Sequence, residues 1–270
     1  MQTGTLRRRR IQPNAFAKRA DKDKETLAEK PVGHRIITCF PYLCAEMRYI
    51  IVLLLSILVG QTATAQEKSA TELRMERQGL VDIKSMEPTI LVDLMYSRAD
   101  NFTGKVLYTD IHRAYLHPEA ARALKKAQAE LKKLRPDLSL KVYDATRPMS
   151  VQQKMWNVVA GTPIYFYVSN PKNGGGLHNY GLAVDITLCH AASGDTLHMG
   201  TKVDYMGKLA HVRAENEMLQ KGKISKEAIT NRKLLRKVME AAGFKVLPTE
   251  WWHFNFRSRA EAKAHYKVVR

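Results

Sequence analysis

Asp185 is the residue whose setting most demands a chemical explanation. It interrupts the apolar run LAVDITL, and His178 precedes it by seven residues at the end of a glycine-containing segment. An unpaired carboxylate is costly to bury, so Asp185 needs a cation, a set of backbone donors or a metal ion beside it. An aspartate that faces solvent at a strand end, or that pairs with an arginine, is the simpler alternative.

The segment EWWHFNF, which contains Glu250 and His253, favours the metal. A lone histidine among aromatic residues is more often a hydrogen-bonded core residue than a ligand. Together with His178 and Asp185, however, His253 completes two imidazoles and one carboxylate, a set that catalytic zinc uses while water takes the fourth position. We therefore expect one Zn²⁺ per chain, although other divalent metals accept the same ligand types.

Glu250 is the expected general base, which would take a proton from the activated water and pass it to the leaving amine. Successive strand residues face opposite sides, so Glu250, three positions before His253, must lie on a bend if both are to face one site. Pro248 and Thr249 favour such a bend. Other histidines lie in polar stretches and are weaker ligand candidates: His190, His198 and His211.

Arg147 follows the segment YDA in YDATRP and so leaves a strand end at a turn. Its planar guanidinium could face a developing oxyanion or a substrate carboxylate. A structural ion pair with Asp144, three residues earlier, is the alternative, and the two interpretations are compatible.

Apolar periodicity predicts the elements that must position these residues. The expected helices cover 118–134, 150–159 and 226–242, the last with Ser225 as N-cap and Gly243 as terminator. The expected strands cover 139–145, 182–188 and 250–256, and 161–177 is expected to be a glycine-rich loop. This irregular alternation favours an α+β domain, a small antiparallel sheet flanked by helices, over a regular parallel array.

The N-terminal part of the chain divides into two segments. Residues 47–65 combine an arginine, a short apolar run and a closing Ala-Thr-Ala, which is typical of a secretory signal peptide and too short to span a membrane. Residues 1–46 then form a disordered basic leader, or an untranslated stretch if Met47 is the initiator. We expect the catalytic domain to cover 66–270 and the mature protein to be secreted, into the periplasm, without stable membrane insertion.

Composition, charge and cysteine count indicate which kinds of partner and cross-link to expect. The chain has 270 residues, is 45% hydrophobic and 26% charged, and carries a formal net charge of +18. Its basic N-terminal run is also found in nucleic-acid-binding tails, but export would separate it from nucleic acid, so we expect no such partner. Only Cys189 lies beyond the signal segment, which excludes an intramolecular disulfide there. The sequence does not indicate an oligomeric state.

Six ordered segments resemble the vancomycin-resistance-type D-alanyl-D-alanine dipeptidases, members of the Hedgehog-like zinc D,D-peptidases. They are YSRADNFTGK (96–105), YDATRP (143–148), HNYGLAVDITL (178–188), MGTKVDY (199–205), NRKLLRKVMEAAGF (231–244) and EWWH (250–253). HxxxxxxD alone is a weak signal and EWWH a moderate one. The six in family order are a strong joint match that spans most of residues 90–256.

The resemblance implies a role for each matching residue. His178, Asp185 and His253 become the zinc ligands, Glu250 the general base, and Arg147 the group that stabilises the tetrahedral intermediate. The expected substrate-binding residues are Tyr96, Asp144 and Asp204, of which Tyr96 and Asp204 would shape the pocket for the free amino end of a small D,D-dipeptide. The implied activity is hydrolysis of D-alanyl-D-alanine to D-alanine, in cell-wall peptide turnover or scavenging rather than in antibiotic resistance.

One departure from the family pattern concerns the substrate. Family members carry a serine two residues before the first ligand, where this chain has Gly176, so a substrate hydrogen bond is expected to be missing. Two alternatives therefore stay open: a D,D-carboxypeptidase acting on longer peptidoglycan peptides, and a non-catalytic, zinc-stabilised binding module. The presence of Glu250 argues against the second.

Overall fold

The computed structural model describes residues 67–270. The expected leader (1–46) and signal segment (47–65) lie outside the described residues, so they and the domain boundary at residue 66 stay predictions. No helix among the described residues is long and apolar enough to cross a membrane.

A five-stranded sheet organises the chain, in the order β2-β4-β5-β7-β6. The strands are β2 (Leu91–Val92), β4 (Leu138–Asp144), β5 (Ala183–His190), β6 (Lys245–Leu247) and β7 (Glu250–Asn255). All neighbours pair antiparallel except β2 and β4, which pair parallel at one edge. The central strand β5 is buried along all but its last residue, so it forms the middle of the core.

Two long amphipathic helices cover the sheet, α4 (Pro118–Leu134) and α7 (Lys226–Ala241), and they contact each other as well as the strands. Helix α4 starts with proline in its first turn, where a missing N–H costs nothing. Helix α7 starts where the Ser225 hydroxyl accepts from the Ala228 amide at 3.0 Å. It ends before Gly243, whose φ of 96° suits a residue without a Cβ.

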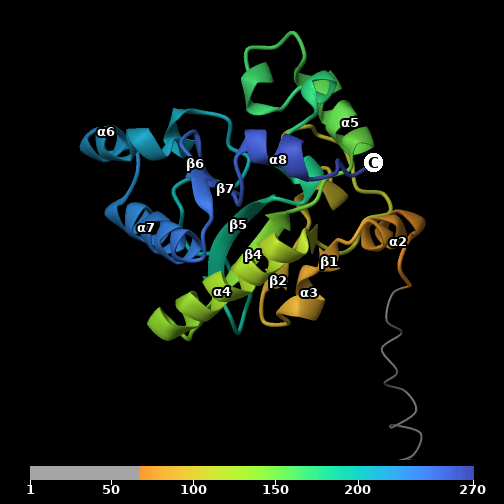
Figure 1. The fold of residues 1–270 in the computed structure, drawn as a ribbon. Coiled ribbons are helices and arrows are strands. Elements are labelled where there is room, and N and C mark those ends of the chain that lie inside the picture. The colour runs from red at the N-terminus through yellow and green to blue at the C-terminus, as the bar shows by residue number, and fades with distance from the viewer. Residues whose placement is uncertain (1–66) are drawn as a thin grey trace, which may run out of the picture. The chain divides into compact units, whose positions relative to one another are not determined.

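Shorter elements complete the fold. The helices are α2 (Ala70–Arg77), α3 (Ile83–Met86), α5 (Met149–Val159), α6 (Glu215–Gln220) and α8 (Arg259–His265), and β1 (Val81–Asp82) pairs with β3 (Tyr115–Leu116) in a separate small sheet. In Figure 1, α5 and α8 lie at the opposite end of the view from α4 and α7.

The predicted fold class, an α+β domain with a small antiparallel sheet flanked by helices, is confirmed. The helix predicted at 118–134 has those bounds, and the others differ by one residue at an end. Two short edge strands, β2 and β6, were not predicted. The segment predicted as a loop, 161–177, contains two 3-10 turns and leads into a third.

Two shifts of register bring the chemically important residues together. Between β4 and β5 the pairing slips after Val142, so that Asp144 lies opposite Asp185. Between β6 and β7, Val246 lies opposite Phe254, but the next residue, Leu247, lies opposite Glu250. Residues 251–253 of β7 therefore have no partner in β6, and this bulge replaces the bend expected before Glu250. It lets Glu250 and His253 line the same cavity despite their odd spacing.

Candidate metal centre and active-site cavity

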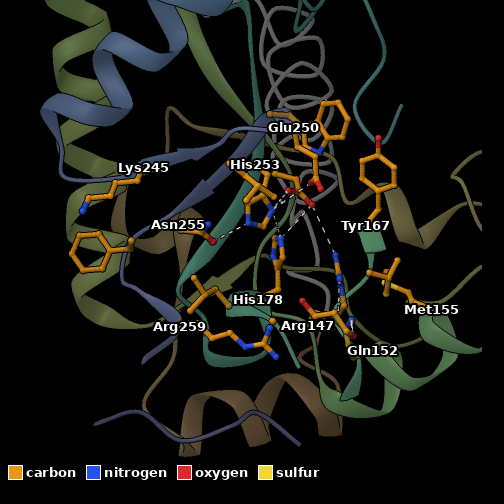
Figure 2. A pocket seen from close by; sticks show the side chains of 18 of the residues that line it. Arg147, Gln152, Met155, Tyr167, His178, Lys245, Glu250, His253, Asn255 and Arg259 are labelled. Atoms are coloured by element: carbon orange, nitrogen blue, oxygen red, sulfur yellow. Dashed lines mark hydrogen bonds and ion pairs between the residues drawn. The ribbon is translucent and has the colours of Figure 1, made fainter. Parts of the chain in front are cut away.

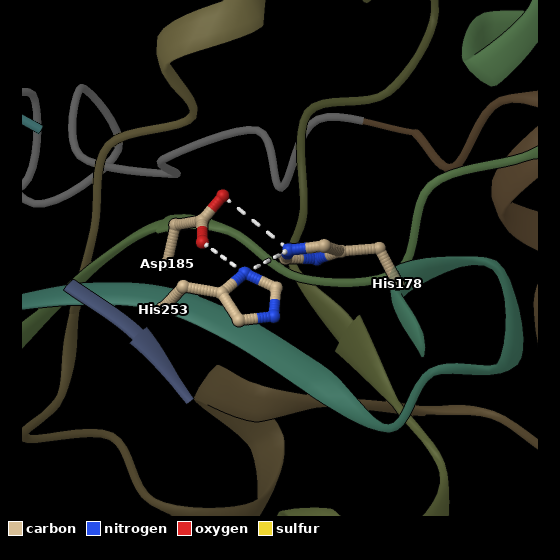
Figure 3. Close-up of side chains that lie close together, drawn as sticks. All are labelled: His178, Asp185 and His253. Carbon is tan, nitrogen blue, oxygen red and sulfur yellow. Dashed lines mark hydrogen bonds and ion pairs between the residues drawn. The ribbon is translucent and has the colours of Figure 1, made fainter. Parts of the chain in front are cut away.

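His178, Asp185 and His253 converge as the sequence predicts, with one potential ligand atom from each lying within 4.8 Å of the others (Figure 3). Asp185 and His253 are direct cross-strand partners on β5 and β7, and His178 comes from the 3-10 turn Leu177–Tyr180. His253 Nδ1 lies 2.9 Å from Asp185 Oδ1 and 3.2 Å from His178 Nε2. His178 Nε2 lies 3.4 Å from Asp185 Oδ2.

The other nitrogen of each imidazole already has a partner. His178 Nδ1 lies 2.6 Å from the Ala145 carbonyl oxygen, and His253 Nε2 lies 2.9 Å from Asn255 Oδ1. Each outer partner is an acceptor, so with a metal bound the ring proton would sit on the outer nitrogen and the inner nitrogen would be free to act as a ligand. Metal-binding histidines usually have such an outer acceptor. The donor set therefore fits a divalent metal such as zinc.

Asp185 is ionised in this setting. Burial by itself would raise the pKa of Asp185, but the adjacent His178 and His253 outweigh it and hold that pKa well below its usual range. Arg147 contributes little direct pairing, because its Nη2 lies 3.9 Å from Asp185 Oδ2. A buried carboxylate with two imidazoles and no close guanidinium favours the metal over the arginine alternative raised by the sequence.

Glu250 faces the same centre from the start of β7 (Figure 2). Its Oε2 lies 3.9 Å from His253 Nδ1. Burial raises the pKa of Glu250 to about 8, with His253 opposing the rise and Asp185 adding to it. A bound divalent cation would lower that pKa again. A carboxyl group that titrates near neutrality beside a metal centre suits a proton carrier.

Arg147 is buried and held by its own neighbours. Its Nε and Nη2 donate to Asp144 Oδ2 at 3.1 and 2.5 Å, and its Nη1 donates to Gln152 Oε1 at 3.0 Å. Asp144 also accepts from the Tyr108 hydroxyl at 2.5 Å. The ion pair with Asp144 is therefore present, while Arg147 still lines the cavity.

The predicted substrate-binding role of Asp144 needs a correction. The sequence placed it among substrate-binding residues, but its side chain is fully buried and it does not line the cavity. Both of its oxygens are already used, by Tyr108 and Arg147. Its position supports Arg147 from behind rather than contacting a ligand.

Tyr96 and Asp204 meet on the cavity wall, although they are 108 residues apart in the sequence. The Tyr96 hydroxyl donates to Asp204 Oδ2 at 2.6 Å, and both residues line the cavity. Burial raises the pKa of Asp204 to about 7, and the nearby Asp185 adds to this rise. Asp204 has a φ of 64°, a costly conformation for a residue with a Cβ that often marks functional sites.

The cavity itself has a volume of about 540 Å³ and is open at its mouth. Figure 2 shows Lys245 and Tyr167 on opposite sides of the histidine pair. Sequence reasoning missed several of its lining residues, including Gln152, Ser169, Trp252, Asn255 and Arg259. Asn255 could have been found, because it lies two positions after His253 on the same strand face. The weaker histidine candidates, His190, His198 and His211, are not in the metal cluster.

Comparisons with known proteins show which proteins the chain is similar to. A family model described as D-ala-D-ala dipeptidase, Peptidase_M15, matches residues 76–270. The D-alanyl-D-alanine dipeptidase of Escherichia coli K12 is 34% identical over 183 residues, which cover 67% of this chain and 86% of that protein. The D-alanyl-D-alanine dipeptidase of Enterococcus faecalis V583 is 29% identical over 195 residues, 65% of this chain and 90% of that protein. The Enterococcus faecium dipeptidase is 28% identical over 193 residues.

Proposed function

This chain belongs to the Peptidase_M15 family of D-ala-D-ala dipeptidases, and from that premise we propose that it hydrolyses D-alanyl-D-alanine to D-alanine with one zinc ion per chain. The observation that carries the proposal is the convergence of His178, Asp185 and His253 with Glu250 on one cavity. When bound, zinc would polarise the scissile carbonyl and make water nucleophilic at neutral pH. His178 Nε2, Asp185 and His253 Nδ1 would hold it.

Glu250 is the proton carrier in this proposal. It would accept the proton of the attacking water and deliver it to the nitrogen of the leaving D-alanine. Its place beside the proposed ligands supports both steps, and a bound cation would offset the rise in the pKa of Glu250 that burial causes, so that the carboxylate is ionised when water attacks. This carboxyl group beside the ligands favours catalysis over a metal-stabilised binding module.

Arg147 would stabilise the negative charge that develops on the carbonyl oxygen. Asp144 and Gln152 fix three of its guanidinium nitrogens, so little reorganisation is needed when the charge forms. Tyr108, which donates to Asp144, keeps that carboxylate in place. Asp144 therefore acts as a positioning residue for Arg147.

Asp204, with Tyr96, would receive the ammonium group of the dipeptide. The Asp204 side chain is half-buried and makes no ion pair with a described residue, so its carboxylate would gain from a cationic ligand. An N-acylated, longer peptide offers no such charge, so the Tyr96–Asp204 pair favours a dipeptidase over a D,D-carboxypeptidase. We further propose secretion and a role in cell-wall peptide turnover, on the N-terminal sequence pattern alone.

The direct test measures D-alanine release by the purified protein from D-alanyl-D-alanine and from N-acetyl-D-alanyl-D-alanine, with zinc and with a chelator. We expect release from the free dipeptide only, its loss on chelation, and its recovery with zinc. Equal or faster cleavage of the acetylated substrate would favour the carboxypeptidase instead. One bound zinc per chain without cleavage of either substrate would favour the binding module.

A further inference from the structure

Gly176 and Ser169 compete for one place on the cavity wall. Both residues line the cavity, and Gly176 lies two positions before His178. Gly176 has φ −109° and ψ −175°, an extended conformation open to any residue. A Cβ at position 176 would nevertheless lie 2.7 Å from Ser169 Oγ and 3.2 Å from Ser169 Cβ. A side chain at position 176 would therefore require the Ser169 hydroxyl to rotate and the two segments to move apart slightly, whereas glycine leaves the Ser169 side chain undisturbed.

The backbone of Ser169 is tied to the catalytic arginine. Gln152 Nε2 donates to the Ser169 carbonyl oxygen at 2.7 Å, and Gln152 Oε1 accepts from Arg147 Nη1 at 3.0 Å. Gln152 is buried, so this connection is shielded from water. Ser169 and Arg147 consequently keep a fixed relative position on the same wall.

The hydroxyl of Ser169, in contrast, is uncommitted. No hydrogen bond joins it to any residue in the described range 67–270, although a hydroxyl can donate one and accept two. The side chain is only half-buried, so a ligand in the cavity can reach it. It is a neutral donor held beside the segment that carries the first proposed metal ligand.

We propose that the Ser169 hydroxyl donates a hydrogen bond to a carbonyl or carboxylate oxygen of the dipeptide substrate. It would supply from position 169 the contact that the missing side chain at position 176 cannot make. This inference rests on the proposed function and adds a substrate-binding residue to it. Because Gln152 links Ser169 to Arg147, both donors would meet the substrate with their geometry already set.

The first experiment compares Ser169→Ala with the wild-type zinc-loaded protein, using D-alanine release to obtain kcat and KM. Loss of one hydrogen bond should raise KM roughly three- to tenfold, with kcat and zinc content nearly unchanged. Ser150→Ala is the matched control, because Ser150 is exposed on α5 and does not line the cavity. The same comparison with D-alanyl-D-alanine amide, which lacks the carboxylate, identifies the oxygen that Ser169 contacts. A rise in KM for the free acid only would assign the contact to the carboxylate, and an equal rise for both substrates would assign it to the carbonyl oxygen.

The second experiment transfers the hydroxyl group from position 169 to position 176 on the cavity wall. Gly176→Ser alone should raise KM, because its Cβ collides with the Ser169 side chain. Ser169→Gly removes that obstacle, so the double variant Ser169→Gly, Gly176→Ser should return KM to within about threefold of the wild-type value. Such non-additivity is expected only of residues that share space or a partner. A purely structural role for Ser169 would not be rescued from position 176.

Two results would overturn the inference while leaving the proposed function intact. One is normal KM in Ser169→Ala, and the other is a double variant no better than Ser169→Gly alone. If Ser169→Ala does not fold, as judged by its thermal unfolding, the double variant still decides the question. Absence of D-alanine release by the wild-type protein would refute the proposed function, and the inference with it.

Discussion

Asn255 offers the sharpest test of the metal centre, because it acts on the metal only through His253. Its Oδ1 lies 2.9 Å from His253 Nε2 and fixes the ring proton on that nitrogen. In Asn255→Ala the proton can move to Nδ1, which lies 2.9 Å from Asp185 Oδ1 and would then donate to that carboxylate. Zinc would have to displace this hydrogen bond before binding.

The size of the effect follows from these contacts. One neutral hydrogen bond contributes about 0.5–1.5 kcal/mol, and removal of an outer partner of a metal-binding histidine commonly weakens the metal about 10- to 100-fold. The Asn255 contact is a single neutral hydrogen bond to the His253 side chain, which is 13% exposed. We therefore expect the lower end of that range, a zinc Kd about tenfold higher in Asn255→Ala. Asn255→Asp replaces the amide by a charged acceptor and should tighten zinc binding instead.

Competition with a chromogenic zinc chelator would measure the Kd of wild type, Asn255→Ala and Asn255→Asp. Asn157→Ala is the matched control, because Asn157 is an exposed asparagine on α5. Thermal unfolding of the metal-free proteins checks that the fold is retained. A zinc Kd in Asn255→Ala within twofold of wild type, or equal weakening by Ala and Asp, would refute the assignment of His253 Nδ1 as the ligand atom.

Four further predictions concern the cavity and the core. Glu250→Gln should lower kcat at least 100-fold, the usual scale of general-base catalysis, and retain zinc by elemental analysis; substantial turnover would exclude Glu250 as the base. The pKa of Asp204 is about 7 in the metal-free protein, so this carboxyl group is neutral at lower pH and its ionisation should contribute to a rise of kcat/KM for the dipeptide up to about pH 7. Asp204→Asn should make that rise in the pH profile shallower, and an unchanged profile would contradict the role of Asp204. Asp144→Asn leaves a buried guanidinium without its anion and should lower the free energy of unfolding by about 3 kcal/mol in urea titrations; an unchanged midpoint would contradict the supporting role. Thr187→Val removes a buried hydroxyl that has no partner among the described residues and should raise the free energy of unfolding by up to about 1 kcal/mol, which a lower urea midpoint would disprove.

Periodicity made the main elements predictable. The apolar stripe of α4 and its flanking prolines define a helix without help from the rest of the chain. The convergence of His178, Asp185 and His253 was predictable from residue type, because a carboxylate within the apolar strand β5 requires a compensating charge. Edge strand β2, with two residues, is too short for any period, and its parallel pairing with β4 depends on tertiary contacts.

The missed features depend on three-dimensional proximity. The β7 bulge is defined by the pairing of β7 with β6, so the sequence of β7 alone does not predict it. Only the turn before Glu250 was visible in the local sequence. Asp144 was misplaced because the sequence could not show that Tyr108, 36 residues away, occupies one of its oxygens. Likewise, the clash of Ser169 with a side chain at position 176 arises only when the intervening turns fold back.

The cross-strand pairing of Asp185 with His253 has a consequence for how the protein acquires its metal. Two of the three proposed ligands are fixed on adjacent strands of the sheet, whereas His178 is carried by a short turn after a run of glycines. The sheet thus holds two of the proposed ligands in a preformed arrangement, and the turn supplies the third ligand, which completes the site. Capture of the ion should proceed in two kinetic steps, a rapid one set by the strands and a slower one set by the turn. Stiffening the turn would then lengthen the residence time of the metal more than it speeds its arrival.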